Sequence, residues 1–364
     1  MSARVTPSWR GRHEGEDMAE LLLAGVTHYP PLSLRDQDMA GILRGFLADP
    51  AIPAEAKDPS RWPQAMQAEW GQDEARASAA THRAELLEGF ARVRAELERF
   101  DPDFILVWGD DQYENFKEDL SPPFALLAYD DLEAQPWAKF PRPNVWGEPA
   151  DHTIKVRGRP DAARWLTAQL LEDGIDVAYA YKPLHHPSLA HAFLNTQLYL
   201  DYDRVGFPWP LVNMPINCYG SKVICAKGGF VPFGQELALD PPSPSPKRLM
   251  QRGAAVARAL QASPWRVALL ASSSWSHAFL VDHLWRLRPD TPADRVLYDA
   301  LASGDFDTWE RTPLASVERA GQQEVLNWFA LMGAARELGR STPDWHTFVE
   351  TWCFNSNKVF SVWS

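Results

Sequence analysis

Short apolar runs alternate along the chain with longer stretches in which apolar residues recur at helical spacing. The apolar runs predict strands at residues 21–27, 104–108, 175–181, 211–217 and 267–272. Several runs, such as FILVW and VALLA, are apolar at every position, which is typical of central strands covered on both faces. The alternation therefore predicts an α/β fold, with a central, mostly parallel sheet and helices on both faces.

Two helices have clear limits in the sequence. One is predicted over residues 81–100, where an apolar stripe ends at Asp101-Pro102. The other begins at Ser245, a good N-terminal capping residue, with Pro246 in its first turn. Each helix leads directly into a predicted strand, so both belong to helix-then-strand units of one sheet.

The rest of the chain suggests a single domain with additions. We expect an N-terminal extension at residues 1–20 and a catalytic domain over residues 21–341. Two segments rich in proline and tryptophan, at about 48–72 and 137–160, look like insertions into that domain. The last segment, 342–364, is rich in aromatic residues and is predicted to pack on the domain as a tail.

Composition narrows the function classes. The 364 residues carry a formal net charge of −12, and the sequence has no basic cluster, so a nucleic-acid partner is not expected. The three cysteines form no CxxC pair, which fits a reduced, cytoplasmic setting. No apolar run is long enough to span a membrane, and no membrane association is expected.

Polar residues gather where the predicted strands end, which is where α/β folds bind ligands. His28 follows the first strand, and the second strand runs into the acidic and amide cluster Asp110-Asp111-Gln112. The strand at 267–272 leads into Ser276-His277. A further histidine-rich stretch lies between these strands and contains His185, His186 and His191.

Glu324 lies in a predicted helix over residues 319–338, with Trp328, Leu331 and Ala335 spaced to share its side. An ionised carboxylate among apolar neighbours costs several kcal/mol, roughly, unless a cation or hydrogen bonds compensate it. Imidazole and carboxylate ligands with open coordination positions are typical of non-haem Fe(II) oxygenases. His28 and Glu324 are therefore candidates for two ligands of such a site.

Each of these residues also has a purely structural interpretation. A single histidine after a strand is commonly a hydrogen-bonded structural residue, and Asp110 and Asp111 are good turn formers. The pair His185-His186 fits an exposed loop, and Glu324 fits a helical ion pair. The residues alone thus predict a metal-dependent α/β enzyme and no particular reaction.

Five segments, in their order along the chain, resemble the motifs of the LigB-type (class III) extradiol dioxygenases. They are GVTHYPPL, DPDFILVWGDDQYENF, LAHAFLNTQLYL with PLVNMPINCYG, SPKRLMQRGAAVARAL with VALLASSSWSHAFL, and AGQQEVLNWFALMGAA. The resemblance extends from about residue 21 to residue 339, apart from the two insertions. It implies a LigB-like α/β domain that opens a catechol- or gallate-like ring with O2.

The resemblance also assigns roles to residues. It implies non-haem Fe(II) as the cofactor, with Mn or Zn as alternative metals, and a small aromatic molecule and O2 as partners. For the oligomeric state, the resemblance to the family suggests a homodimer. The implied metal ligands are His28, Gln112 and Glu324; the implied catalytic residues are His277, as the base, and His191; the implied substrate-binding residues are His186, Asp111 and Ser276.

The sequence departs from the family pattern at Gln112, which stands where the motif has a second histidine ligand. This Asp-Gln pair resembles the methylgallate-dioxygenase-like branch. Because an amide oxygen is a weaker donor than imidazole, three outcomes stay open. Gln112 ligates through its oxygen, Asp110 or Asp111 ligates in its place, or the site has lost dioxygenase activity.

Two other functions compete with ring cleavage. A catalytically altered binding protein on the same fold would hold no stoichiometric metal. A metal-dependent hydrolase would use the same ligands to activate water, without O2 and with a preference for zinc.

Overall fold

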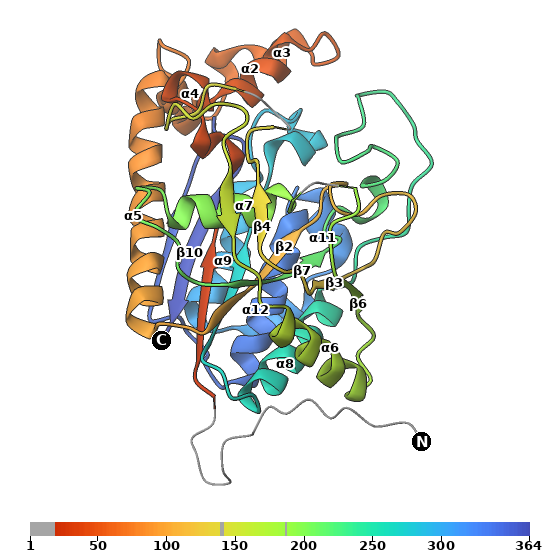
Figure 1. Cartoon of the computed structure of the whole chain (residues 1–364). Helices are drawn as coiled ribbons and strands as arrows, with labels where there is room; N and C mark the ends of the chain where they lie inside the picture. The colour runs from red at the N-terminus through yellow and green to blue at the C-terminus, as the bar shows by residue number, and fades with distance from the viewer. Residues whose placement is uncertain (1–18, 139–141, 186–187) are drawn as a thin grey trace, which may run out of the picture.

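The computed structural model describes residues 19–138, 142–185 and 188–364. Its centre is an eight-stranded sheet with the order β6-β3-β7-β2-β8-β1-β10-β9 (Figure 1). The strands of this sheet are β1 (Leu21–Val26), β2 (Phe104–Asp110), β3 (Ala125–Leu127), β6 (Ala178–Ala180), β7 (Leu211–Ile216), β8 (Val267–Ser272), β9 (Trp345–Val349) and β10 (Lys358–Trp363). A separate two-stranded antiparallel sheet pairs β4 (Leu132–Ala134) with β5 (Ile154–Val156).

The middle of the sheet is parallel. β2 pairs in parallel with both β7 and β8, and β8 pairs in parallel with β1. Every residue of these four strands is buried, as their continuous apolar sequences predict. Antiparallel pairs occur only toward the edges of the described sheet, where β10 pairs with β1 and β3 with β7. The predicted α/β fold with a mostly parallel sheet is confirmed.

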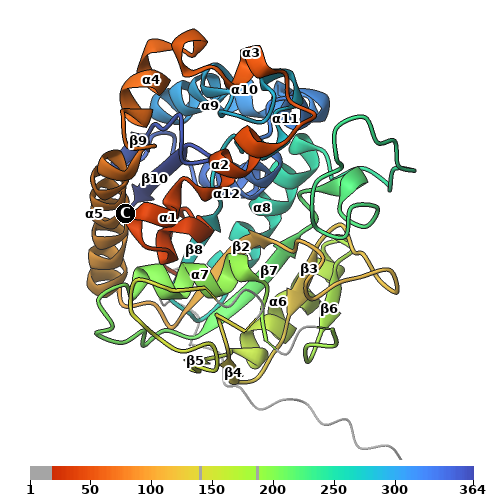
Figure 2. The same ribbon diagram turned by 90° about the horizontal axis from the view of Figure 1, so that it is seen from above.

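Helices cover both faces of the sheet (Figure 2). One apolar core lies between the sheet and a layer that includes α2 (Gly41–Ala48), α5 (Arg76–Phe100) and α7 (His191–Leu200). The other core lies under α6 (Pro160–Glu172), α8 (Pro246–Gln261) and α12 (Leu326–Glu337). The remaining α-helices are α1 (Asp36–Met39), α3 (Ala54–Lys57), α4 (Gln64–Trp70), α9 (Thr291–Ser303), α10 (Phe306–Arg311) and α11 (Leu314–Arg319).

Both helices with clear sequence limits are present. α5 ends at Phe100, as predicted, but begins at Arg76 rather than at residue 81. α8 begins at Pro246, and the Ser245 hydroxyl accepts a hydrogen bond from the backbone N–H of Arg248. Of the predicted strand at 175–181, only β6 is formed, at the edge of the sheet, where the Tyr179 side chain is exposed.

The prediction of one continuous helix over residues 319–338 was wrong. α11 ends at Arg319, a 3-10 turn covers Gln323–Val325, and α12 begins at Leu326. The helical path is interrupted at Gly321, whose φ of +67° suits glycine. The Gly321 carbonyl oxygen accepts a hydrogen bond from the backbone N–H of His277 at 2.8 Å. A Cβ at this position would lie 2.7 Å from the His277 carbonyl oxygen, so the break lets two site segments approach closely.

The aromatic segment 342–364 contributes β9 and β10 to the sheet, and β10 lies directly beside β1. The predicted insertion at 48–72 contacts this segment through Glu69 on α4. The Glu69 carboxylate accepts hydrogen bonds from the Thr351 hydroxyl and from the backbone N–H groups of Trp352 and Cys353. These contacts tie the end of the chain to the domain. Among the described residues, no helix combines the length and the apolar character that crossing a membrane requires.

α8 and α12 pack at unusually short range because glycines lie at their contact. A Cβ on Gly253 would lie 1.7 Å from the Ala330 carbonyl oxygen, and a Cβ on Gly333 would lie 2.0 Å from that of Met250. These contacts are backbone to backbone, so no flexible side chain can move aside.

We expect Gly253→Ala to lower the free energy of unfolding by about 2–3 kcal/mol, because the added methyl group forces the two helices apart. Gly45 in α2 is the matched control: it is helical and exposed, and an added Cβ meets nothing within 4 Å. Gly45→Ala should be neutral or stabilise by about 0.5–1 kcal/mol. Denaturant unfolding of both variants measures the difference, and equal stability of the two would contradict the close packing.

Candidate metal and active site

Four charged or ionisable side chains meet at the carboxyl ends of the central strands. His28 follows β1, Asp110 is the last residue of β2, and His277 lies beyond the end of β8. Glu324 comes from the 3-10 turn that precedes α12. All four are at most 4% exposed. The parallel register of β1, β8 and β2 brings these strand ends together, as expected for a ligand site in an α/β fold.

The Glu324 carboxylate lies between the two imidazoles. Its Oε2 atom is 3.2 Å from Nε2 of His28 and 3.3 Å from Nε2 of His277. Oδ1 of Asp110 lies 3.3 Å from the same Nε2 of His28. The ligand atoms of His28, Asp110 and His191 also lie within 4.8 Å of one another. Two carboxylates and three imidazoles therefore lie together at these strand ends.

Two buried carboxylates, Asp110 and Glu324, interact in this cluster. Burial and, second, the neighbouring Glu324 carboxylate raise the pKa of Asp110 to about 7, against the opposing effect of His28. Burial would also raise the pKa of Glu324, but His277 and His28 outweigh it and hold that pKa below its ordinary value. A divalent cation would remove the repulsion between the two carboxylates.

The donor atoms fit such a cation. Among the described residues, Nε2 of His28, both carboxylate oxygens of Asp110 and Oε2 of Glu324 are buried and take part in no hydrogen bond. Buried polar atoms without hydrogen bonds are uncommon and costly. One imidazole nitrogen and carboxylate oxygens are a suitable donor set for Fe(II) and Mn(II).

A backbone contact to the ring nitrogen that faces away from the cluster orients His28. Its Nδ1 lies 3.1 Å from the carbonyl oxygen of Ser272, the last residue of β8. A carbonyl only accepts, so Nδ1 carries a proton. Burial lowers the pKa of His28, but Glu324 and Asp110 outweigh it and raise that pKa above its ordinary value. Nε2 is therefore free to bind a metal only after it has lost its proton. Backbone contacts of this kind commonly fix the tautomer of metal-binding histidines.

Gln112, the predicted third ligand, points elsewhere. Its side-chain N–H donates to the carbonyl oxygen of Gly228, in a loop that follows β7. Asp110, two residues earlier, lies at the cluster instead. Of the three outcomes open in the sequence, this geometry favours ligation by Asp110, while the ligand role of Gln112 stays a prediction.

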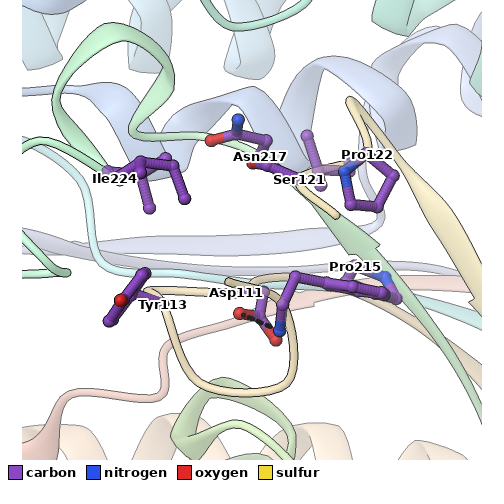
Figure 3. A pocket seen from close by; sticks show the side chains of 10 residues that line it. Asp111, Tyr113, Ser121, Pro122, Pro215, Asn217 and Ile224 are labelled. Carbon is purple, nitrogen blue, oxygen red and sulfur yellow. Dashed lines mark hydrogen bonds between the residues drawn. The ribbon is translucent and has the colours of Figure 1, made fainter. Parts of the chain in front are cut away.

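Asp111 has a structural role in this conformation. Its carboxylate accepts hydrogen bonds from the backbone N–H groups of Glu114, Asn115 and Phe116. In Figure 3, Asp111 lies with Tyr113 and Pro215 along one side of a pocket. That pocket has a volume of only about 10 Å³, roughly the room of a single water. An aromatic ring does not fit there.

The Ser276 hydroxyl is also engaged by the backbone. It donates to the Ala320 carbonyl oxygen at 2.5 Å and accepts from the Asp290 N–H at 2.8 Å. Its predicted contact with substrate therefore stays untested. His186, the third predicted substrate-binding residue, lies outside the described residues.

His191 begins α7 and lies at the accessible side of the cluster, with a side chain 27% exposed. Its Nδ1 is 2.7 Å from the Glu114 carboxylate. Burial lowers the pKa of His191, but Glu114 outweighs this and raises it to about 9. His191 is therefore positively charged at neutral pH. Its ring meets that of His28 edge-on, with centroids 5.2 Å apart.

His277 differs in charge from His191. Burial lowers its pKa, although the Glu324 carboxylate acts in the opposite direction. A neutral imidazole is able to accept a proton. The site thus combines a histidine that is charged with one that is available as a base.

Tyr219 was not identified from the sequence. It lies beyond β7, and its hydroxyl donates to Oε1 of Glu324 at 2.5 Å. This bond leaves Oε2 to face the imidazoles. Tyr219 and Gln323 also line a pocket of about 340 Å³, within the usual range for small-molecule sites. The only sequence signal was its position after a predicted strand.

The chain is similar to two curated dioxygenases, while no family model matches it. A 2,3-dihydroxyphenylpropionate/2,3-dihydroxicinnamic acid 1,2-dioxygenase of Azotobacter vinelandii is 25% identical over 290 residues, which are 73% of this chain and 80% of that protein. A second enzyme of this name, from Pseudomonas putida, is 26% identical over 194 residues, 53% of this chain and about half (49%) of that protein. The resemblance to the LigB-type extradiol dioxygenases is confirmed as a distant relationship.

We expect Asp110→Asn to weaken Fe(II) binding on the order of 100-fold, because a neutral amide is a weaker donor than the carboxylate that faces the cluster. Gln112→Ala should change the affinity by less than about threefold, since its amide is bonded to Gly228. Anaerobic titration of the metal-free protein with Fe(II) measures both. The opposite order of effects would identify Gln112 as the ligand.

Proposed function

We propose that the protein is a non-haem Fe(II)-dependent dioxygenase that opens a dihydroxylated aromatic ring with O2. One observation carries the proposal. The buried atoms of His28, Asp110 and Glu324 that could ligate a metal face one another without hydrogen bonds. A neutral histidine, His277, lies beside them. The two distant relatives, which are named as 1,2-dioxygenases of 2,3-dihydroxyphenylpropionate and 2,3-dihydroxicinnamic acid, support the same reaction.

His28, Asp110 and Glu324 would hold the metal. Bound Fe(II) would supply a centre at which the two ring oxygens and O2 are brought together and exchange electron density. Ser272 and Tyr219 serve this set indirectly, because they fix the orientation of His28 and of the Glu324 carboxylate.

His277 and His191 divide the proton and charge handling. Nε2 of His277 accepts a proton from a substrate hydroxyl, since burial keeps this imidazole neutral. His191 is charged through Glu114, and its position at the accessible side of the cluster suits it to stabilise negative charge that develops on oxygen.

The pocket beside Tyr219 is the proposed entry for the substrate. Lys222 and Arg319 line it together with Glu318 and Asp282. Asp282 already forms an ion pair with Arg286 at 2.6 Å, so the remaining charge of the pocket is positive. This favours an aromatic diol with an acidic side chain, of the kind that the names of the relatives specify.

Oxygen consumption tests the proposed reaction. The protein is loaded anaerobically with Fe(II) and mixed with catechol, gallate and 2,3-dihydroxyphenylpropionate, and O2 uptake is followed. We expect uptake with at least one diol, with the acidic diol at a lower KM than catechol. No uptake across the panel, with iron bound, would overturn the proposal; turnover without O2 would favour the hydrolase.

A substitution separates proton transfer from metal binding. His277→Gln should keep iron at the wild-type stoichiometry but lower kcat by about 100-fold or more, because it removes the base. His152→Gln is the control, since His152 is partly exposed and pairs with Glu148 rather than with Glu324; its kcat should stay within about twofold of wild type. Iron content and O2 uptake measured on the same samples decide the result. Unchanged turnover in His277→Gln would exclude this role.

A further inference from the structure

Asp294, a residue remote from every sequence motif, is the centre of a buried network behind the site. It lies in the first turn of α9 and is fully buried. Its carboxylate accepts hydrogen bonds from the backbone N–H of Ser276 at 3.0 Å, from the Gln322 side chain at 2.7 Å and from the Asn357 side chain at 2.8 Å. Three segments that are far apart in the sequence therefore donate hydrogen bonds to one side chain.

Two of these segments carry site residues. Ser276 immediately precedes His277, and Gln322 lies two residues before Glu324. The third segment supports the first, because the Asn357 carbonyl oxygen accepts from the Trp275 N–H at 2.9 Å. Asp294 thus connects the loop of the proposed base to the turn of the proposed carboxylate ligand.

The chemistry of the network requires a carboxylate. All its partners are N–H donors, and only a side chain that accepts at both oxygens satisfies them together. Burial raises the pKa of Asp294 to about 7, so the charge is held at an energetic cost that a neutral asparagine would avoid. Asparagine has the same shape, but its NH2 group would face another donor.

We propose that Asp294 is a positioning residue, which holds His277 and Glu324 at their mutual distance through Ser276 and Gln322. It contacts neither the metal ligands nor the proposed substrate pocket directly. The inference builds on the proposed function, in which His277 is the base and Glu324 a ligand. It adds a residue outside the LigB-like motifs to the set on which turnover depends.

The test compares Asp294→Asn with Asp290→Asn. Asp290 lies at the start of the same helix, where its side chain caps the first turn, and asparagine is an equally good cap. We expect Asp294→Asn to lower kcat per bound iron on the order of 10- to 100-fold with KM within about threefold, because misplacement by about an ångström impairs catalysis. Asp290→Asn should stay within about twofold of wild type.

A double variant distinguishes positioning from loss of stability. In Asp294→Asn/Gln322→Glu, the donor and the acceptor exchange places. The carboxylate introduced at position 322 accepts a hydrogen bond from the NH2 group introduced at position 294, and the negative charge lies at position 322. We expect kcat to recover to within about threefold of wild type, whereas Gln322→Glu alone places two carboxylates together and loses activity. Unchanged kcat per iron in Asp294→Asn, or no recovery in the double variant, overturns the proposal.

A structural measurement keeps the proposal independent of the reaction. In a crystal structure of metal-free Asp294→Asn, the separation of His277 Nε2 and Glu324 Oε2, 3.3 Å here, should increase, while Asp290→Asn retains it. If the wild-type protein cleaves no diol, the proposed function fails and this distance still decides the role of Asp294. An unchanged distance shows that Asp294 does not position the pair.

Discussion

The interaction on which the site depends is the buried contact of the Glu324 carboxylate with two imidazoles. A carboxylate without solvent is unstable unless other groups compensate its charge. Here Oε2 lies between His28 and His277, and Oε1 accepts from Tyr219. Asp110 adds a second carboxylate, whose pKa is raised first by burial and second by the charge of Glu324. The proposed metal site rests on this set of contacts.

The fold supplies the geometry of this cluster. Parallel pairing of β1, β8 and β2 brings three chain segments to one edge of the sheet, and the break at Gly321 lets the Glu324 turn approach the His277 loop. Asp294 then joins these two segments from behind. Site residues that come from separate elements are thus held by a backbone contact and by one buried side chain, that of Asp294.

The distant relationship to the two dioxygenases is compatible with a changed ligand. Asp110 and Gln112 lie at the same strand end, two residues apart. Asp110 ends β2 with its carboxylate at the cluster, whereas Gln112 lies beyond the strand and bonds to Gly228. A ligand at Asp110 would keep a negatively charged oxygen at the metal, and it would make the site richer in oxygen donors than one with two histidines.

The sequence by itself determined the central strands, because residues buried on both faces must be apolar throughout, and it placed His28, Asp110 and His277 at or near their ends. It also identified Glu324 as a candidate, but on a continuous helix that the structure does not have. It did not show β9 and β10 in the aromatic tail, nor the break before Glu324, because both depend on partners distant in the chain: β1 for the strands and the His277 loop for the break. The same holds for Tyr219, Asp294 and the direction of Gln112. The local spacing of apolar residues indicates which face of an element is buried. The partner of a polar atom is decided only when the tertiary structure brings the segments together.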